Sequence, residues 1–399
     1  MLIAGIVAEY NPFHNGHQWH IRRTRAELGE DAVIVCCMSG DFVQRGEAAV
    51  YSKFARAEAA ARCGADLVFE LPLPWALSSA EGFARGAVGL LHALRAVDVL
   101  SFGSESGDAG ALSAAAEALL DPTLGPEIRA ALADGVPYAA ARQSALALRS
   151  PESAELLSSP NNILAVEYIK ALYDLRSDMR VLTFRREGAE HDGVGGSGCI
   201  RSASELRTQL AAGQDIAPFI PAAAAGIYAR EREHGRGPVS MRALEPALLS
   251  RLRLLPDAAF EALPDAGEGL ANRLMRAARE EPGWDGVLSA AKTRRYALSR
   301  LRRMCMCACL GVSRGMADGV PPYARILAAT ARGREALRLI AGRTRIPIIT
   351  KPAVARELPR EHLAVFELGA AARDLYVLAA SAREERRGGS DWRTGPAVI

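Results

Sequence analysis

The residues best suited to chemistry form a turn near the start of the chain: His14, Asn15, Gly16 and His17. Gly16 lets the backbone approach a ligand closely, because glycine has no side chain. A helix that begins here presents free N–H groups and the positive end of its dipole to an anion. Two imidazoles three residues apart can point to one side and donate hydrogen bonds to phosphate oxygens. The turn therefore predicts stabilisation of charge on a phosphoryl group during in-line displacement.

Other interpretations of this turn stay open. Three of the seven histidines (His14, His17 and His20) fall within the same short stretch. A short motif match is only a hypothesis, so they can also be surface or capping residues. A metal site has less support, because no third ligand is obvious and the spacing is not that of a helical metalloprotease. We predict no metal bound by these histidines.

The elements that must position the turn can be predicted from apolar runs and turn residues. Strands are expected at residues 2–10, 32–38, 66–71 and 97–102, and helices at 17–28, 52–63 and 78–94. Alternation of this kind is typical of an α/β fold in which helices cover both faces of a parallel sheet. Because crossovers are right-handed, all the strands end at one edge, where ligands bind in such folds. Four polar turns should meet there, at residues 14–17, 39–44, 72–79 and 103–105.

The remainder of the chain is predicted to be largely helical. Residues 108–175 are expected to form a helical insertion beside the sheet, followed by a fifth strand at 180–185. Ser202 and Glu205 form a capping box that begins another helix. A division into two domains is expected, with the sheet in residues 1–215 and a mainly α-helical domain in residues 216–399. The second of these domains contains one strand-like run, residues 345–350.

Composition and charge limit the function further. The chain of 399 residues is 49% hydrophobic and 24% charged, and no apolar run approaches the roughly 20 residues that a membrane span needs. No basic segment precedes the first apolar run, and the seven cysteines suit no disulfide framework, so we expect a cytoplasmic protein. The net charge of +3 is small, but residues 291–303 hold six basic residues and no acidic one. This segment, expected to be a helix, is either a solvated face or a contact for RNA phosphates.

The turn resembles the HxGH signature of the nucleotidylyltransferase superfamily, which is related to class I aminoacyl-tRNA synthetases. Residues 202–207 resemble a second signature of that superfamily, S-[ST]-x-[IL]-R, with Ala203 where a second hydroxyl residue is common. The resemblance implies a Rossmann-like parallel sheet. It also implies that Ser202, Ser204 and Arg207 hold the β- and γ-phosphates of ATP.

A narrower resemblance, to the tRNA(Met) cytidine acetate ligase family, covers almost the whole chain. Six segments carry it: residues 5–17, 38–47, 64–72, 102–105, 159–164 and 345–351. The sequence Glu190-His191-Asp192 departs at one position from the family's usual Tyr-His-Asp. The resemblance implies that acetate attacks the α-phosphate of ATP to give acetyl-adenylate and pyrophosphate. The wobble cytidine of elongator tRNA(Met) then takes the acetyl group and becomes N4-acetylcytidine.

The same resemblance implies a set of site residues. His14, His17 and Arg207 would be catalytic. The expected contacts with ATP are Val7, Ala8, Glu9, Tyr10, Asn11, Pro12, Phe13, His14, Asn15, Gly16, His17, His20, Gly103, Asn161 and Arg186, together with the two serines. Asn162 is an alternative to Asn161, and Arg185 is an alternative to Arg186.

Further residues are candidates for the other substrates. Residues 39–45, with Ser39 and Gln44, form either an acetate pocket or a structured turn at the strand edge. Lys53 contacts phosphate or RNA, or is solvated. Candidates for tRNA contacts in the basic segment are Arg294, Arg295 and Arg302. Candidates for a Mg²⁺ ion that carries pyrophosphate are Asp41, Glu70 and Glu105, among which the sequence does not choose.

Two other functions are compatible with the motifs. One is a nucleotidylyltransferase that adenylates a small metabolite in cofactor synthesis, and the other is a non-catalytic RNA-binding protein. The former class usually has a much shorter chain, so the extra 180 or so residues with a basic segment favour a macromolecular substrate. We expect no membrane contact and no obligate protein partner, and the oligomeric state stays open.

Overall fold

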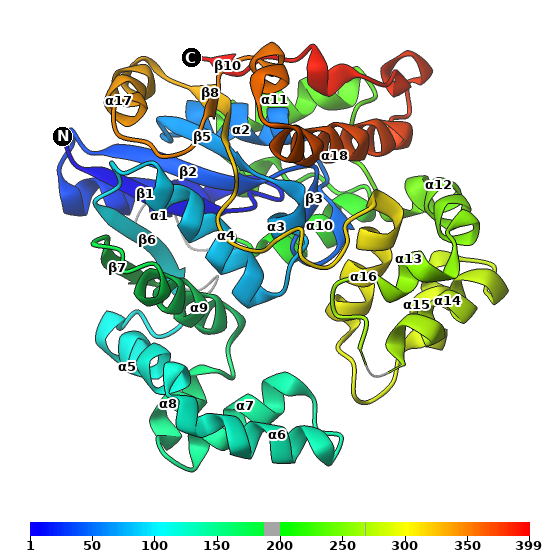
Figure 1. Cartoon of the computed structure of the whole chain (residues 1–399). Helices are drawn as coiled ribbons and strands as arrows, with labels where there is room; N and C mark the ends of the chain where they lie inside the picture. Colours follow the sequence, from blue (N-terminus) through cyan, green and yellow to red (C-terminus); the bar gives the residue numbers. More distant parts are fainter. Residues whose placement is uncertain (187–199, 268) are drawn as a thin grey trace.

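A mixed sheet forms the centre of the molecule, which is a computed structural model describing residues 1–186, 200–267 and 269–399 (Figure 1). In the described residues the sheet has eight strands in the order β10-β8-β5-β2-β1-β6-β7, with β9 paired to β8. The strands are β1 (Ile3–Ala8), β2 (Val33–Ser39), β5 (Leu67–Leu71), β6 (Val99–Ser104), β7 (Arg180–Arg185), β8 (Ala324–Ala329), β9 (Ile348–Ile349) and β10 (Ala397–Val398). The five strands predicted between residues 2 and 185 are confirmed.

The first strand lies in the middle of the sheet, parallel to both of its neighbours. Gly5 of β1 is opposite Val35 of β2 on one side and Leu100 of β6 on the other. All seven residues of β2 are buried, as expected for a central strand covered on both faces. The predicted polar turns therefore meet at one edge of the sheet.

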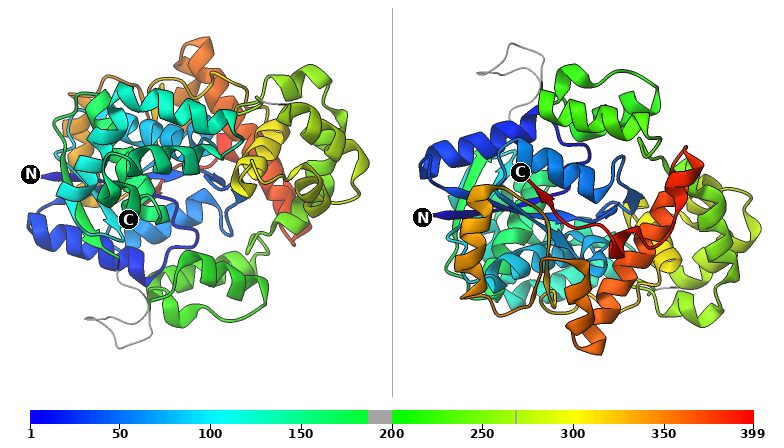
Figure 2. Two further views of the ribbon diagram at one scale, coloured as in Figure 1. Left: turned by 90° about the horizontal axis from the view of Figure 1, so that it is seen from below. Right: turned by 90° about the horizontal axis from the view of Figure 1, so that it is seen from above.

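Helices cover both faces of the sheet (Figure 2). One face packs on α1 (Asn15–Leu28), α2 (Lys53–Arg62), α10 (Ala203–Ala211) and α11 (Ala222–Glu233). The other face packs on α4 (Ala80–Ala93), α5 (Ala109–Leu120), α9 (Pro160–Asp174) and α17 (Ala331–Ala341). Among the described residues, no helix is both long and apolar enough to cross a membrane.

The predicted helical insertion is only partly an insertion. Ala165 and Val166 of α9 are buried in the core of the sheet, so α9 is the crossover helix between β6 and β7. The part that extends from the sheet comprises α6 (Gly125–Ala133), α7 (Tyr138–Ala147) and α8 (Pro151–Leu156), as Figure 1 shows. Composition did not separate these helices, because all are rich in alanine and leucine.

The C-terminal half contains a helical cluster with a core of its own. It is built from α12 (Met241–Leu254), α13 (Asp257–Glu261), α14 (Leu270–Glu280), α15 (Trp284–Ala291) and α16 (Leu298–Leu310). The chain then returns to the sheet through β8, β9 and β10, and α18 (Arg360–Tyr376) packs between the two parts. The sheet thus takes strands from both sides of residue 215, and a domain boundary there remains a prediction.

Three local expectations need correction. Residues 291–303 do not form one helix, because α15 ends at Ala291 and α16 begins only at Leu298. Strand β8 was missed because its sequence, Ala-Arg-Ile-Leu-Ala-Ala, is equally typical of a helix. The proline-flanked stretch after β5 contains a short helix, α3 (Leu73–Ala76), and residues 42–48 contain an antiparallel hairpin of β3 (Phe42–Val43) and β4 (Glu47–Ala48).

Candidate functional site

The two histidines of the opening turn cap helix α1 reciprocally. His14 is the N-cap, and its Nδ1 accepts a hydrogen bond from the backbone N–H of Gly16 at 3.1 Å. Nδ1 of His17 accepts one from the N–H of His14 at 3.2 Å, and the two ring centroids are 3.7 Å apart. Because Nδ1 accepts in both rings, the proton of each neutral imidazole lies on Nε2.

This geometry leaves a donor available on His14. Its side chain is only 3% exposed, and its Nε2 is buried without a hydrogen-bond partner among the described residues. A buried N–H without an acceptor costs about 1–3 kcal/mol, so such an atom indicates a missing partner. A phosphate oxygen has the required chemistry. The capping interpretation is therefore correct for Nδ1, while Nε2 remains suited to a ligand.

The histidines at this site are neutral at physiological pH. Burial lowers the pKa of His14 to about 3, and the positive charges of Arg186 and Arg207 contribute. Burial, followed by His14, lowers the pKa of His17 well below its usual value. Burial and Arg186 lower the pKa of His20 to about 4. Nε2 of His20 lies 2.9 Å from Oγ of the buried Ser101, so this histidine contacts the sheet.

Glycine is required between the two histidines. A Cβ atom on Gly16 would lie 3.0 Å from Cε1 of His14. That contact is tighter than ordinary van der Waals packing and would displace the imidazole. Gly16 therefore keeps the capping ring in place, in addition to the backbone approach expected from the sequence.

Arg207 reaches the turn from helix α10. Its Nη1 donates a hydrogen bond to the carbonyl of Asn11 at 3.0 Å. Ser202 is the N-cap of α10, as the capping box predicts, and its Oγ accepts from the N–H of Glu205 at 3.2 Å. Ser204 is exposed in the first turn of the same helix. The structure thus brings the second signature beside the first, although 190 residues separate them.

Of the two alternatives at the end of β7, the structure brings Arg186 to the histidines. Its charge lowers the pKa of His14, and its backbone N–H donates to the carbonyl of Ser104 at 2.7 Å. A Cβ on Gly103 would lie 3.0 Å from Cγ of Arg186, so the Arg186 side chain packs directly against Gly103. Arg185 packs its backbone against Gly107 instead.

The two asparagines at the start of α9 have different surroundings. Asn162 is buried, and its Oδ1 accepts from the N–H groups of Glu105 and Ser106 at 2.9 and 3.1 Å. Asn161 is less buried, and its Nδ2 donates to Oε1 of Glu105 at 2.7 Å. Asn162 therefore shapes the loop after β6, which leaves Asn161 as the better candidate for a ligand contact.

The loop after β2 is anchored to the turn. The N–H of Gln44 donates to Oε1 of Glu9 at 2.7 Å, and Nε2 of Gln44 donates to the carbonyl of Ser78 at 3.3 Å. Burial raises the pKa of Glu9, although the nearby arginines oppose this. Ser39 is fully buried, and its Oγ has no partner among the described residues. Gln44 thus lies at the site, and the role of Ser39 toward acetate stays a prediction.

The prediction that Lys53 contacts phosphate or RNA is wrong. Its side chain is 1% exposed, and its Nζ forms ion pairs with Glu70 at 2.7 Å and Asp391 at 2.9 Å. Arg325 joins the same two carboxylates from β8. Burial alone would raise the pKa of Asp391, but Lys53 and Arg325 lower it to about 2. Lys53 is the first residue of α2 and belongs to a buried network of ion pairs.

Sequence reasoning also missed Arg56, the largest fully buried side chain. Its guanidinium donates to the backbone carbonyls of Tyr51 at 2.9 Å and Ser39 at 3.2 Å, and also to those of Glu9 and Gly40. These bonds join the ends of β1 and β2. In the sequence, the only sign of this role was that Arg56 falls on the apolar face of an alanine-rich helix.

Two of the carboxylates proposed for Mg²⁺, Glu70 and Glu105, are satisfied by protein partners, whereas Oδ2 of Asp41 is buried without a hydrogen-bond partner among the described residues. Glu70 is paired with Lys53 and Arg325, and Glu105 accepts from the start of α9. Oδ1 of Asp41 accepts from the N–H of Lys53 and pairs with Arg373. Across residues 1–186, 200–267 and 269–399 no group of three or more His, Cys, Asp or Glu side chains is arranged to hold a metal.

The arginines of the basic segment differ in their contacts. Arg302 pairs with Glu47, and its backbone approaches Gly46, where a Cβ would lie 2.5 Å from the Arg302 carbonyl carbon. Nη2 of Arg295 donates to the carbonyl of Leu132 in α6 at 3.3 Å. Arg294 is exposed. Their contact with tRNA stays a prediction, and residues 190–192 lie outside the described part of the chain.

Comparisons with known proteins agree with this geometry. The family model described as HIGH Nucleotidyl Transferase matches residues 1–391. A tRNA(Met) cytidine acetate ligase of Acetivibrio thermocellus is 35% identical over 420 residues, covering 98% of each chain. Another, of Syntrophotalea carbinolica, is 40% identical over 361 residues, covering 88% of this chain and 85% of the relative. The crystal structure of Thermotoga maritima TmcAL bound with alpha-thio ATP superposes with a TM-score of 0.93, at 34% identity and over 100% of both chains.

Proposed function

Because the chain belongs to the tRNA(Met) cytidine acetate ligase family of HIGH nucleotidyl transferases, we propose that it is an ATP-dependent ligase that joins acetate to a cytidine of tRNA(Met). The relatives match over nearly their whole length, so the catalytic sheet and the helical cluster are both represented in them. A nucleotidylyltransferase limited to a small metabolite would need no such second part.

One observation of the site supports this proposal above all. The buried Nε2 of His14 lacks an acceptor in the described residues and lies where Arg186 and Arg207 contribute positive charge. An N–H donor and two guanidinium groups around one point are suited to the oxygens of a triphosphate. The relative solved with an ATP analogue supports ATP as the ligand.

In the first step, an oxygen of acetate attacks the α-phosphorus of ATP, the bond to the β-phosphate oxygen breaks, and pyrophosphate leaves. His14 and His17 are neutral, so they stabilise the α-phosphate oxygens as N–H donors rather than as cations. Arg207 and Arg186 offset the charge of the β- and γ-phosphates.

The second step uses the nucleotide-binding edge for acyl transfer. The N4 amine of the wobble cytidine attacks the acetyl carbon, the bond to the AMP oxygen breaks, and the amine loses a proton to solvent. We assign contacts with the adenosine to Asn161, in the first turn of α9, and Gly103, near the end of β6. Any Mg²⁺ would arrive with the phosphates of ATP, and of the three candidate carboxylates only Asp41 keeps an unpartnered oxygen, Oδ2, among the described residues.

An isotope-exchange assay tests the first step. Exchange of labelled pyrophosphate into ATP should depend on acetate and need no RNA. Folded protein that shows no acetate-dependent exchange would contradict the proposal. Nucleoside analysis of tRNA incubated with the protein, ATP and labelled acetate tests the second step. Labelled N4-acetylcytidine should appear in tRNA(Met) and be absent from a tRNA whose wobble base is not cytidine.

The substrate also determines the location that we propose for the enzyme. A tRNA-modifying ligase works where tRNA is used, so we place it in the cytoplasm. Formation of a dinucleotide from ATP and a phosphorylated metabolite, without RNA, would instead favour the small-molecule alternative.

A further inference from the structure

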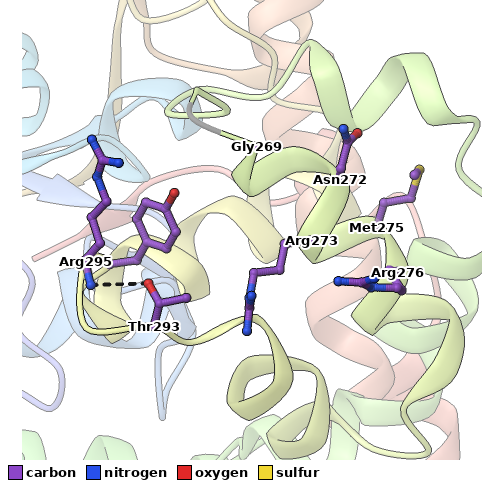
Figure 3. Close-up of a pocket in the computed structure, with 8 residues that line it drawn as sticks. Gly269, Asn272, Arg273, Met275, Arg276, Thr293 and Arg295 are labelled. Carbon is purple, nitrogen blue, oxygen red and sulfur yellow. Dashed lines mark hydrogen bonds between the residues drawn. The ribbon is translucent and has the colours of Figure 1, made fainter. Parts of the chain in front are cut away.

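A cavity of about 590 Å³ lies in the C-terminal helical cluster, between α14 and the loop of residues 292–297 (Figure 3). Arg273 and Arg276 line it from the helix, and Thr293 and Arg295 line it from the loop. None of these residues belongs to the histidine turn. The cavity is therefore separate from the site already described.

The described lining is strongly positive. It includes three arginines and no carboxylate. Nε of Arg273 donates to the carbonyl of Ala291 at 3.0 Å, which fixes this side chain along the wall. Arg276 is exposed and forms no hydrogen bond or ion pair with any described residue. Guanidinium groups bind phosphate in a bidentate way, so the ligand is an anion, with Arg276 as its principal contact.

The size of the cavity exceeds what one phosphate needs. Cavities of about 300–1,000 Å³ hold organic ligands of the size of a nucleotide. Asn272 and Thr293 supply neutral hydrogen-bonding groups beside the arginines, and Met275 supplies an apolar surface. A phosphate that carries a nucleoside uses all three kinds of contact.

A chain of contacts links the cavity to the hairpin beside the histidine turn. The loop that lines it leads into α16, in which Arg302 follows Leu298 by one turn, about 6 Å along the helix axis. The backbone of Arg302 packs against Gly46 of the β3–β4 hairpin. The same hairpin region carries Gln44, which is bonded to Glu9 of the turn.

We propose that this cavity binds one nucleotide of the tRNA substrate. The inference rests on the proposed function, because it assumes an RNA substrate at the histidine turn. The arginines would hold the phosphate of that nucleotide. Contacts to phosphate position the RNA and do not by themselves read its sequence.

The test compares three variants of the full chain. Arg276→Ala removes the principal contact, and Arg276→Lys keeps the charge without the planar fork. Arg279→Ala is the matched control, because Arg279 is on the same helix, pairs with Asp257 and does not line the cavity. In acetyl transfer, Arg276→Ala should raise KM for tRNA about tenfold or more and reduce the slope of log affinity against log salt by about 1. Arg276→Lys should recover part of the loss.

Acetate-dependent pyrophosphate exchange should be equal in all three variants and the wild type, since that step needs no RNA. The inference is overturned if Arg276→Ala and Arg279→Ala raise KM for tRNA equally, or if exchange falls together with transfer. Failure of the proposed function is a different result, in which the wild type itself acetylates no tRNA. In that case, direct binding of tRNA to the same variants still tests the cavity: loss in Arg276→Ala alone supports it, and equal binding refutes it.

Discussion

The histidine turn and the C-terminal cavity use positive charge in opposite ways. At the turn the donors are neutral imidazoles held by backbone hydrogen bonds, and the buried charges beneath them are paired or bonded to carbonyls. In the cavity the donors are arginines on an exposed helix face, and Arg276 has no partner among the described residues. Fixed donors stabilise the charge that develops at phosphorus during the reaction, whereas RNA binding needs exposed positive charge that can contact phosphate.

Loss of a charge should therefore matter most beneath the turn. Asp391→Asn leaves Lys53 and Arg325 buried with one carboxylate fewer, and the free energy of unfolding should fall by about 3–5 kcal/mol. Denaturant unfolding measures this. Asp257→Asn is the control, because Asp257 is exposed and, among the described residues, pairs with Arg279 at the surface, so its effect should stay within about 1 kcal/mol. Equal losses in the two variants would abolish the contrast between the regions.

The next largest effect should come from the unpartnered nitrogen of His14. Asparagine is a good N-cap, so His14→Asn keeps the helix cap while it removes the Nε2–H donor. Acetate-dependent exchange should fall about 10²–10³-fold, the effect of losing one donor to a developing charge. KM for tRNA should not change, which is the reverse of the result expected in the cavity. Wild-type exchange in this variant would mean that Nε2 has no role at phosphorus.

Acid should destabilise the turn before it affects the cavity. The pKa of His14 is about 3 in the folded protein and about 6.5 when unfolded, so the unfolded chain binds more protons between these values. Stability then falls as pH decreases below 6.5, by about 1.4 kcal/mol per pH unit for this group, and is unaffected above it. The decrease in the free energy of unfolding from pH 7 to pH 5 should be about 2 kcal/mol smaller in His14→Asn than in the wild type. Parallel pH dependence in the two proteins would refute this.

The smallest effect should come from the boundary between the two regions. Arg302 and Glu47 are partly exposed, so Arg302→Ala should cost at most about 1 kcal/mol of stability. Its KM for tRNA should change less than that of Arg276→Ala. A large loss of pyrophosphate exchange would instead show that the Arg302 side chain, rather than the close backbone contact at Gly46, positions the hairpin.

The catalytic edge could be predicted from the sequence because local signals agree there. Buried apolar strands, serine caps and the spacing of His14 and His17 each depend on neighbouring residues. Arg207 was assigned to the site only through its motif, and the structure shows that it contacts the carbonyl of Asn11 in the turn.

What the sequence did not reveal depends on distant partners. Lys53 was treated as a surface cation because its partners, Glu70 and Asp391, are far away in the chain and one lies in a segment without a motif. Strand β8 has a helix-like composition, and only pairing with β5 makes it a strand. The cavity combines α14 with a loop that the charge pattern alone had assigned to a helix.

The ion pair between Lys53 and Asp391 has a consequence for protein synthesis, because 338 residues separate its members. The histidine turn leaves the ribosome early, whereas the carboxylate shared by Lys53 and Arg325 is added only at residue 391. A nascent or truncated chain that lacks Asp391 contains every residue predicted to touch ATP but lacks the buried network beneath them. The two buried cations therefore gain their shared carboxylate only after residue 391 has been translated, so its stabilisation is absent from shorter nascent chains.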